Sequence, residues 1–186
     1  PTNATFGFVG MLLKLLREEE PTHLAVAMDV SGDRGTFRSE LYPQYKATRP
    51  PPPEDLPVQV ERVLKMLREV GVPLLGVEGF EADDVIATVA RQLRSSGVRV
   101  RVISKDKDLK QLLRRDEFVL YDIHTDELVT EADLLEATGL KPEQVVDMLA
   151  LMGDTVDNVP GVPGIGPKTA AKLIAQHGSL DALLAA

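Results

Sequence analysis

Carboxylate side chains recur in close groups along this sequence, at spacings that suit the binding of a metal ion. Glu81, Asp83 and Asp84 fall within four residues, and an amphipathic helical pattern follows them at once. A helix dipole favours each such charge by only ~0.3–1 kcal/mol, which is too little to hold three like charges together. A divalent cation would hold them. The alternative interpretation is a solvated helix start capped by acids.

Other acidic positions extend this pattern beyond a single helix start. The chain has no cysteine, and its histidines lack ligand-like spacing, so a metal site here would offer oxygen atoms alone. Oxygen ligands select Mg²⁺ or Mn²⁺ over zinc. Two such ions ~3.5–4 Å apart can hydrolyse a phosphodiester, because one activates water while the other stabilises the leaving oxygen. The candidate metal ligands are Asp29, Glu81, Asp83, Asp84, Asp106, Asp108, Asp154 and Asp157.

A stretch of interleaved aromatic and basic residues, 37–49, could bring cations to a phosphate group. It stands out in a chain that is only 4% aromatic. Such a mixture suits single-stranded nucleic acid, with rings under the bases and cations against the phosphates. The alternative is an ordinary loop held in place by its tyrosine and phenylalanine side chains. The candidates are Arg38, Lys46 and Arg49 for contact with a scissile phosphate, and Tyr42 and Tyr45 for stacking.

A glycine-rich hairpin at 161–166 leads into a helical pattern near the end of the chain. Backbone amides at a helix start bind phosphate oxygens, and glycines let a backbone approach closely. The spacing does not match a phosphate-binding Walker loop. We therefore interpret this region as a helix-hairpin-helix type grip on the sugar-phosphate backbone, with a glycine-rich interhelical turn as the alternative. Its candidate DNA-binding residues are Gly164, Gly166, Lys168, Thr169 and Lys172.

Helices and strands alternate along the first part of the chain. Alternation of this kind predicts a parallel sheet covered by helices on both faces. Ligand sites in such sheets lie beyond the carboxyl ends of the strands, and the acids at 29, 81–84, 106 and 108 each follow a predicted strand. The sequence predicts helices at 5–17, 56–70 and from 82, buried strands at 24–28 and 74–77, a strand at 98–103, an added strand at 118–121, and helices beginning at Thr130 and Pro142.

Bulk composition bounds the possibilities without deciding between them. The 186 residues are 44% hydrophobic and 27% charged, which is ordinary for a globular chain, and no apolar run approaches the ~20 residues of a membrane span. A formal charge of −8 argues at first sight against nucleic acid. If eight of the negative charges serve metal ions, the remaining surface carries a charge of about zero.

Taken together, these motifs closely resemble the 5′-nuclease domain of bacterial DNA polymerase I, within the flap endonuclease superfamily. The similarity extends over essentially all 186 residues. Its most specific parts are 37–38 with 45–49, 79–84, 104–109, and 153–158 leading into 160–166.

The resemblance implies a PIN-like α/β fold, with a mostly parallel sheet flanked by helices and a helical arch at 31–57. It implies a nuclease core at 1–152 and a helix-two-turn-helix DNA-binding region at 153–186, which can hold a K⁺ ion. The implied activity is 5′→3′ exonuclease and structure-specific 5′-flap endonuclease, dependent on two Mg²⁺ or Mn²⁺ ions, in DNA replication and repair. Carried over by position, the eight carboxylates serve the metals, while Lys46 and Arg49 meet the phosphate from the arch.

The implied partner is DNA with a 5′ flap, a branch or a nick, and no membrane. A polymerase domain can follow in the same polypeptide, and the implied location is the bacterial cytoplasm. One departure bears on activity: the family opens with a strand that ends in another metal-ligand aspartate, and this sequence begins after it. We expect the intact protein to contain that strand, because its loss would expose the core. The alternative function is a non-catalytic binder of branched DNA with incomplete metal ligation.

Overall fold

The computed structural model describes residues 1–32, 34–94 and 96–186 of the chain. The chain forms two compact units. Unit 1 comprises residues 1–37 and 49–85, and unit 2 comprises residues 38–48 and 86–186. Helix α2 (Phe37–Leu41) and helix α4 (Ala82–Leu93) each begin in unit 1 and continue into unit 2.

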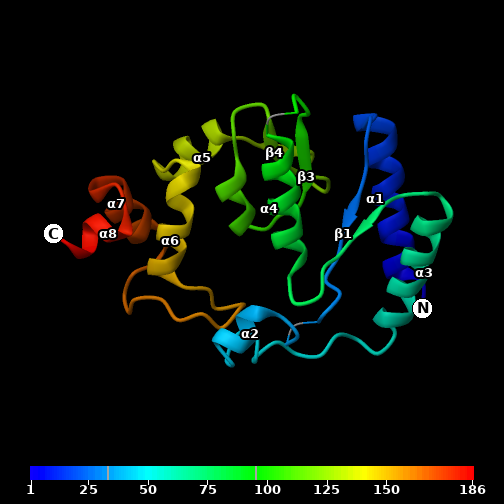
Figure 1. The fold of residues 1–186 in the computed structure, drawn as a ribbon, viewed down its shortest axis with the longest axis horizontal. Coiled ribbons are helices and arrows are strands. Elements are labelled where there is room, and N and C mark those ends of the chain that lie inside the picture. Colours follow the sequence, from blue (N-terminus) through cyan, green and yellow to red (C-terminus); the bar gives the residue numbers. More distant parts are fainter. Residues whose placement is uncertain (33, 95) are drawn as a thin grey trace. The chain divides into compact units, whose positions relative to one another are not determined.

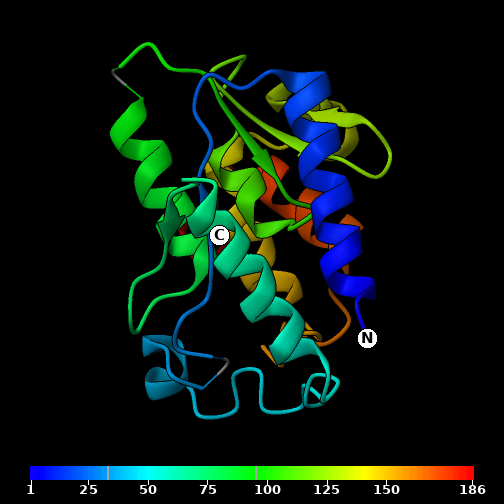
Figure 2. The ribbon, with the colours of Figure 1, turned by 90° about the vertical axis from the view of Figure 1, so that its right-hand side faces the viewer.

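Unit 1 is built from two long helices and a small parallel sheet. Helix α1 (Asn3–Glu19) packs beside helix α3 (Leu56–Glu69), as Figures 1 and 2 show. Strand β1 (Val26–Ala27) pairs in parallel with strand β2 (Leu74–Leu75), so that the carboxyl ends of both strands lie at one edge. This edge leads into the acidic start of α4.

A buried glutamine joins the two helices of unit 1. The side chain of Gln59 on α3 is only 2% exposed, and its Oε1 accepts hydrogen bonds from the backbone N–H groups of Ala4 (2.9 Å) and Thr5 (3.3 Å). These are N–H groups of the first turn of α1, whose own cap residue, Thr2, makes no side-chain cap. The helical pattern of 56–70 predicts that Val60, Val63, Leu64 and Leu67 face inward. Val63 and Leu67 are buried as predicted, but Val60 is 44% exposed and Gln59 is buried in the first turn, where its side chain satisfies backbone donors of α1.

Unit 2 contains a three-stranded mixed sheet. Strand β3 (Val100–Ile103) pairs in parallel with β4 (Phe118–Asp122), from Val100 opposite Phe118 to Ile103 opposite Tyr121. Strand β4 pairs antiparallel with β5 (Glu127–Val129). The 3₁₀ helix η1 (Asp108–Leu112) follows β3 and starts with one of the predicted ligands. The core of this part comprises Ala90, Leu109, Leu112, Leu113, Phe118, Leu120, Leu134 and Val145.

The rest of unit 2 is helical. A capping box between Thr130 and Asp133 starts α5 (Glu131–Thr138), as the sequence predicts. The 3₁₀ helix η2 (Pro142–Gln144) leads into α6 (Val145–Met152). Helices α7 (Pro167–His177) and α8 (Leu180–Leu184) complete the chain. A second core joins these elements through Leu140, Leu151, Ala170, Ala171 and Ile174.

The predicted α/β class is confirmed, while the strands differ in detail. In the described part of the chain they form two sheets, and β1 and β2 are two residues long and half-buried rather than buried strands over 24–28 and 74–77. Among the residues described, these two short strands pair only with each other, over two residues each. Within the described part of 31–57, α2 is the only helix before α3, because prolines at 43 and 50–53 interrupt the backbone hydrogen bonds that a helix needs. None of the helices described is both long and apolar enough to cross a membrane.

Candidate metal centre and nucleic-acid interface

The acids of unit 1 surround the first turn of α4. Asp29, two residues beyond β1, accepts a hydrogen bond at Oδ1 from the N–H of Ala82, at 2.5 Å, and so caps the helix from a distant part of the chain. Asp84 in the first turn accepts a hydrogen bond at Oδ2 from the N–H of Glu81, at 3.0 Å. Both carboxylates therefore satisfy N–H groups that a helix start would otherwise leave without partners.

Glu81 and Asp83 complete the acidic group at this helix start. The side chain of Glu81 is buried, at 8% exposure, and that of Asp83 is half-buried. The approach to the helix is fixed by Ser31, whose Oγ accepts a hydrogen bond from the N–H of Gly79 at 2.8 Å. The centroids of the Phe37 and Phe80 rings lie 5.6 Å apart in the same unit. Unit 1 thus brings Asp29 to the predicted stretch 79–84, as the rule of strand carboxyl ends predicts.

The acids of unit 2 follow β3 and α6. Asp106 accepts a hydrogen bond at Oδ1 from the N–H of Asp108, at 2.9 Å, and its own N–H donates to Ser104 Oγ at 3.0 Å. This compact turn fixes the order of the two carboxylates after the strand. Asp154 accepts hydrogen bonds at Oδ1 from the N–H groups of Val156 (2.8 Å) and Asp157 (3.2 Å).

A lysine joins these two acidic segments. Nζ of Lys107 donates to Oδ2 of Asp154 at 2.5 Å. Burial opposes ionisation of Asp154, but the hydrogen bonds from Lys107 and from the N–H groups of Asp157 and Val156 outweigh it, so the pKa of Asp154 lies below its usual value. Burial also disfavours the charged form of Lys107, yet the hydrogen bond and the charge of Asp154 raise its pKa overall.

Nearby positive charge and hydrogen bonds stabilise the ionised carboxylate of Asp108 less than that of Asp154. Its Oδ1 is buried and has no hydrogen-bond partner among the described residues. Burial, followed by the negative charge of Asp106, raises the pKa of the Asp108 carboxyl, although Lys107 partly offsets this. A buried carboxylate oxygen next to a further carboxylate fits a hard divalent cation such as Mg²⁺ or Mn²⁺, which prefers oxygen ligands.

The side chains as they stand do not enclose an ion. Within residues 1–32, 34–94 and 96–186, no three acidic or histidine side chains are grouped so that they could hold one metal ion. Backbone N–H groups hold Asp29, Asp84 and Asp106, and the ammonium of Lys107 holds Asp154. A cation that coordinates Oδ2 of Asp154 would approach the ammonium of Lys107.

Two glycines fix the loop that carries Asp154 and Asp157. A Cβ on Gly153 would lie 2.3 Å from the backbone nitrogen of Gly161, and a Cβ on Gly161 would lie 2.3 Å from the carbonyl carbon of Met152. Gly153 also has a φ of +69°, a conformation that favours glycine. The backbones at both ends of the loop can approach this closely only without side chains.

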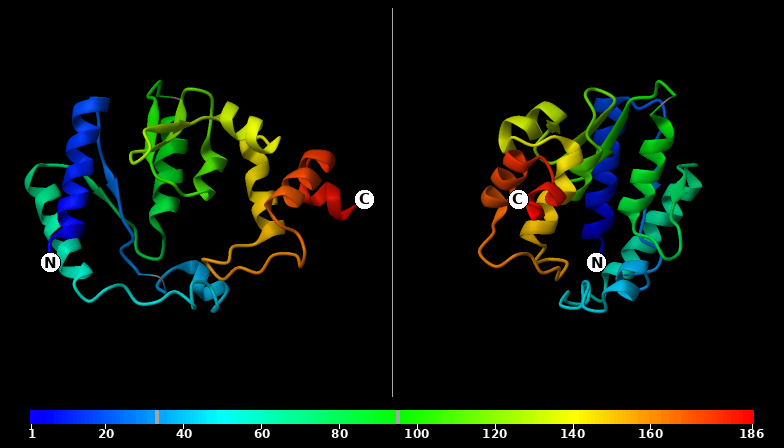
Figure 3. Two further views of the ribbon diagram at one scale, coloured as in Figure 1. Left: turned by 180° about the vertical axis from the view of Figure 1, so that it is seen from behind. Right: turned by 60° about the vertical axis from the view of Figure 1, so that its left-hand side comes forward.

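The basic–aromatic stretch contacts this same loop within unit 2. Figure 3 shows residues 42–48 running beside the segment after α6. The Tyr45 hydroxyl donates to Asp157 Oδ2 at 3.1 Å, and the N–H of Lys46 donates to the carbonyl oxygen of Asp157 at 2.9 Å. Nδ2 of Asn158 donates to the carbonyl oxygen of Gln44 at 2.7 Å. These three bonds join segments more than 100 positions apart.

The side chains predicted to contact phosphates and bases differ in their solvent exposure. Tyr45 and Lys46 are each 8% exposed, and Nζ of Lys46 lies 5.0 Å from the centre of the Tyr45 ring. Tyr42 is exposed, Arg38 is half-buried, and Arg49 is exposed and belongs to unit 1. Contact of Lys46 or the Tyr45 ring with nucleic acid would require the stretch to move away from Asp157, and these assignments stay predictions.

The predicted backbone grip forms the start of α7. Gly164 has a φ of +82°, and Gly166 caps the helix in an extended conformation. The buried face of α7 consists of Ala170, Ala171 and Ile174. The candidate DNA-binding residues on its other face and in the hairpin, Gly164, Gly166, Lys168, Thr169 and Lys172, are all exposed.

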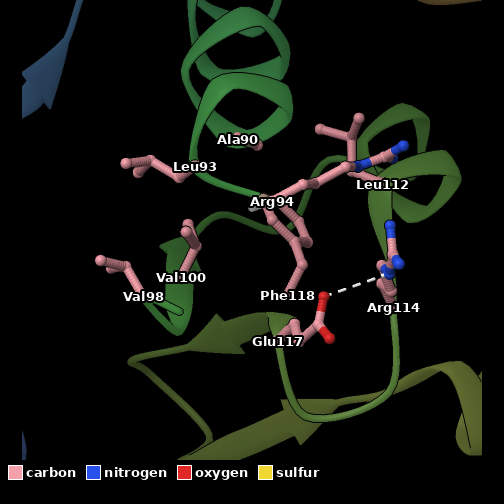
Figure 4. A pocket seen from close by; sticks show the side chains of 9 residues that line it. All are labelled: Ala90, Leu93, Arg94, Val98, Val100, Leu112, Arg114, Glu117 and Phe118. Atoms are coloured by element: carbon pink, nitrogen blue, oxygen red, sulfur yellow. Dashed lines mark ion pairs between the residues drawn. The ribbon is translucent and has the colours of Figure 1, made fainter. Parts of the chain in front are cut away.

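A shallow recess lies apart from these acids, at the carboxyl end of α4 (Figure 4). Its lining includes Leu93, Val100 and Phe118, and Nε of Arg114 pairs with Oε2 of Glu117 at 3.1 Å. The described residues that line it include none of the predicted metal ligands, so this recess is not the predicted metal site.

Comparison with known families identifies the chain. A family described as the N-terminal resolvase-like domain of 5′-3′ exonucleases matches residues 1–139, and the C-terminal SAM fold of the same exonucleases matches residues 140–186. The chain belongs to the 5′-3′ exonuclease family. This confirms the resemblance that the sequence motifs indicated.

Individual relatives agree with this family. DNA polymerase I of Rhizobium leguminosarum is 47% identical over 191 residues, which cover 99% of this chain and 18% of that protein. A 5′-3′ exonuclease of Aquifex aeolicus is 41% identical over 184 residues, which cover 99% of this chain and 63% of that protein. The chain therefore spans only part of the length of either relative.

Solved structures share the fold. The structure of T5 5′-exonuclease with bound divalent metal ions (zinc) has a TM-score of 0.79 at 25% identity, over 97% of this chain and 70% of that one. The catalytic core of Rad2 in complex with DNA substrate has a TM-score of 0.62 at 19% identity, over 98% of this chain and 57% of that one, and supports the fold alone.

Proposed function

We propose that this chain is a divalent-metal-dependent nuclease that hydrolyses DNA phosphodiesters as a 5′→3′ exonuclease and as a structure-specific 5′-flap endonuclease. Membership of the 5′-3′ exonuclease family supports the reaction class. The single observation that carries the metal dependence is the under-compensated acidic group of unit 2. There, the Oδ1 atom of Asp108 is buried without a hydrogen-bond partner among the described residues, and burial and the charge of Asp106 raise the pKa of this carboxyl. Within the same described residues, Lys107 is the ion-pair partner of Asp154.

We assign metal binding to the eight carboxylates predicted from the sequence. Four of them belong to unit 1 and four to unit 2. The assignment rests on their positions in the sequence and on the family, and the local environment of each group supports it. The T5 5′-exonuclease structure is described as binding divalent metal ions, which agrees with such a requirement. When bound, a pair of Mg²⁺ or Mn²⁺ ions supplies an activated water and charge stabilisation for the leaving oxygen.

The basic residues of the stretch 37–49 are proposed to act on the phosphate that is cut. A cation positioned there stabilises charge that grows in the transition state, and therefore raises the rate of the chemical step. Lys46 and Arg49 are the first candidates, and Arg38 is the third. The backbone N–H of Lys46 and the hydroxyl of Tyr45 both donate to Asp157, one of the proposed metal ligands, and these contacts support the assignment.

The glycine hairpin and the exposed lysines of α7 are proposed to hold duplex DNA by its backbone. Amides at a helix start and nearby lysines bind phosphates without reading sequence. Lys168 and Lys172 are exposed on α7, as this role requires. A K⁺ ion at this grip and a polymerase domain in the same polypeptide stay predictions of the resemblance, as do replication and repair as the setting and the bacterial cytoplasm as the location.

A single-turnover assay on one 5′-flap substrate tests the proposal. The protein should cleave with Mg²⁺ or Mn²⁺ and be silent in EDTA. Lys46→Ala should slow cleavage at saturating enzyme by ~10²-fold, on the scale of removing one preorganised donor. Lys168→Ala is the matched variant, and its cleavage should recover at high enzyme concentration because a duplex contact contributes to binding.

The outcomes separate the alternatives clearly. Cleavage that persists after thorough chelation, with contaminating nuclease excluded, would overturn the metal-dependent mechanism. Specific binding of the flap substrate without cleavage under any divalent metal would favour the non-catalytic branched-DNA binder. Full recovery of Lys46→Ala at saturation would make the stretch 37–49 a binding loop and remove its catalytic assignment.

A further inference from the structure

Lys107 occupies an unusual place among the acids of unit 2. In the sequence it stands between Asp106 and Asp108, and its ammonium reaches a third acid, Asp154, 47 positions away. Nζ lies 2.5 Å from Oδ2 of Asp154, whose side chain is only 17% exposed. The lysine thus ties together two acidic segments that repel each other.

The other contacts of Asp154 fix which atom it offers to a cation. Its Oδ1 is occupied by the N–H groups of Val156 and Asp157, so the carboxylate cannot turn freely. Its Oδ2 is the atom directed to Lys107. The negative charges of Asp106 and Asp108 also favour the charged form of Lys107, while Asp154 is its ion-pair partner.

We propose that Lys107 is a built-in counter-ion that competes with a divalent metal ion for Oδ2 of Asp154 and moves away when the metal binds. This inference rests on the proposed function, because it assumes that Asp154 is a metal ligand. An ammonium and a divalent cation repel each other, so the two compete for one carboxylate oxygen at contact distance. Metal binding then includes the work of breaking the lysine contact.

Two consequences follow for the protein. Without a divalent ion, Lys107 limits the repulsion between the loop after β3 and the loop after α6, and so helps to hold both in place. With a divalent ion, the same lysine lowers the apparent affinity and raises the metal concentration at which the site fills. The lysine therefore sets a threshold for metal binding.

The neighbouring Lys105 offers a matched control. Its Nζ pairs with Oδ2 of Asp122 at 2.9 Å, and Asp122 is 16% exposed, close to the 17% of Asp154. Asp122 is not among the proposed ligands. Lys105→Met and Lys107→Met therefore remove the same charge, from a similar ion pair, two residues apart in the sequence.

The first test is calorimetric titration of the wild-type protein and its variants with Mn²⁺. Lys107→Met should bind Mn²⁺ roughly twofold to fivefold more tightly than wild type, the scale of a partly exposed ion pair. Lys107→Arg should stay near wild type, and so should Lys105→Met. In EDTA, Lys107→Met should melt at a lower temperature than wild type, and saturating Mn²⁺ should abolish that difference.

A second test needs no variant. The amine of Lys107 in wild-type protein is labelled with an acylating reagent and quantified by mass spectrometry, in EDTA and in saturating Mn²⁺. The labelling rate of Lys107 should rise with Mn²⁺, while that of Lys105 stays constant. Equal labelling of Lys107 in both conditions, in a protein that demonstrably binds Mn²⁺, would overturn the inference.

The two hypotheses fail in different ways. If wild-type protein shows no heat of binding with Mn²⁺ and no metal-dependent cleavage, the proposed function fails. If it binds Mn²⁺ and cleaves, but Lys107→Met binds no more tightly than Lys105→Met, only the role of Lys107 is overturned.

Discussion

The acids at the start of α4 and the acids that follow β3 and α6 are held by different kinds of partner. In unit 1, Asp29 and Asp84 accept hydrogen bonds from backbone N–H groups of the helix start. In unit 2, backbone N–H groups also hold Asp106 and Asp154, but Asp154 has an ammonium partner as well, and burial together with Asp106 raises the pKa of Asp108. The N–H groups of a helix start are part of the fold, whereas the ion pair of unit 2 depends on the side chain of one lysine.

An acidic cluster can therefore contain two kinds of side chain, those that stabilise the fold and those whose charge destabilises it. An acid that caps a helix stabilises the fold whether or not it binds a ligand. An acid such as Asp108, whose pKa is raised by burial and by Asp106, destabilises the fold in its charged form. The fold does not stabilise the charged form of an acid such as Asp108, whereas a bound cation would.

The largest expected effect is the loss of cleavage when Asp108 is changed to asparagine. A neutral amide cannot replace a charged metal ligand, so single-turnover cleavage should fall by ~10²-fold or more. Stability in EDTA should hold or rise, because a buried negative charge disappears. Flap cleavage and thermal melting of Asp108→Asn are compared with those of Asp122→Asn, which lies outside the proposed ligands. Parallel loss of activity and stability would show that Asp108 is structural.

A smaller effect is expected at Asp29, which caps α4 and is also one of the proposed metal ligands. Asp29→Ala should lower the free energy of unfolding by ~1 kcal/mol, because the cap of α4 is lost. Asp29→Asn should keep most of that stability, since asparagine caps a helix about as well as aspartate. Denaturant unfolding of both variants checks this. Equal stability of wild type and Asp29→Ala would mean that the contact with Ala82 is unimportant.

The smallest effect concerns pH, and its sign differs between Asp108 and Asp154. The raised pKa of Asp108 means that stability is lost as pH rises from the usual 3.8 through the folded value, and the loss persists above it. The lowered pKa of Asp154 stabilises the fold above 3.8, and this is lost as pH falls through the folded value. Relative to wild type, Asp108→Asn should therefore gain stability between about pH 4 and about pH 7, while Asp154→Asn should lose it. Melting curves in EDTA measure both, and the same sign for both variants would contradict the comparison.

Much of this arrangement follows from local sequence patterns. The alternation of helices and strands predicts the α/β class, and the rule of strand carboxyl ends predicts that Asp29 meets the start of α4. Helix starts at Thr130 and Gly166 follow from capping chemistry and glycine. These features depend on periodicity and turns, which a single sequence displays directly.

The contacts that the sequence did not reveal are made by long side chains or between distant segments. The pairing of Lys107 with Asp154 does not follow from the sequence pattern, although the position of the lysine between two aspartates is a signal for it. The bond between Tyr45 and Asp157 spans 112 positions, and no local pattern encodes it. Gln59 breaks the apolar stripe of α3 because backbone donors of another helix require it, so periodicity alone favoured Val60.

The position of Gln59 also bears on how the first helix comes to exist. Helix α1 begins without a side-chain cap of its own, and its opening N–H groups are satisfied from α3, more than 50 residues later. Nucleating an isolated helix is unfavourable, and an uncapped start makes it more so. The first turn of α1 therefore becomes stable only when α3 has docked against it. We therefore expect these two helices to form and unfold together, even though 36 residues separate them in the chain.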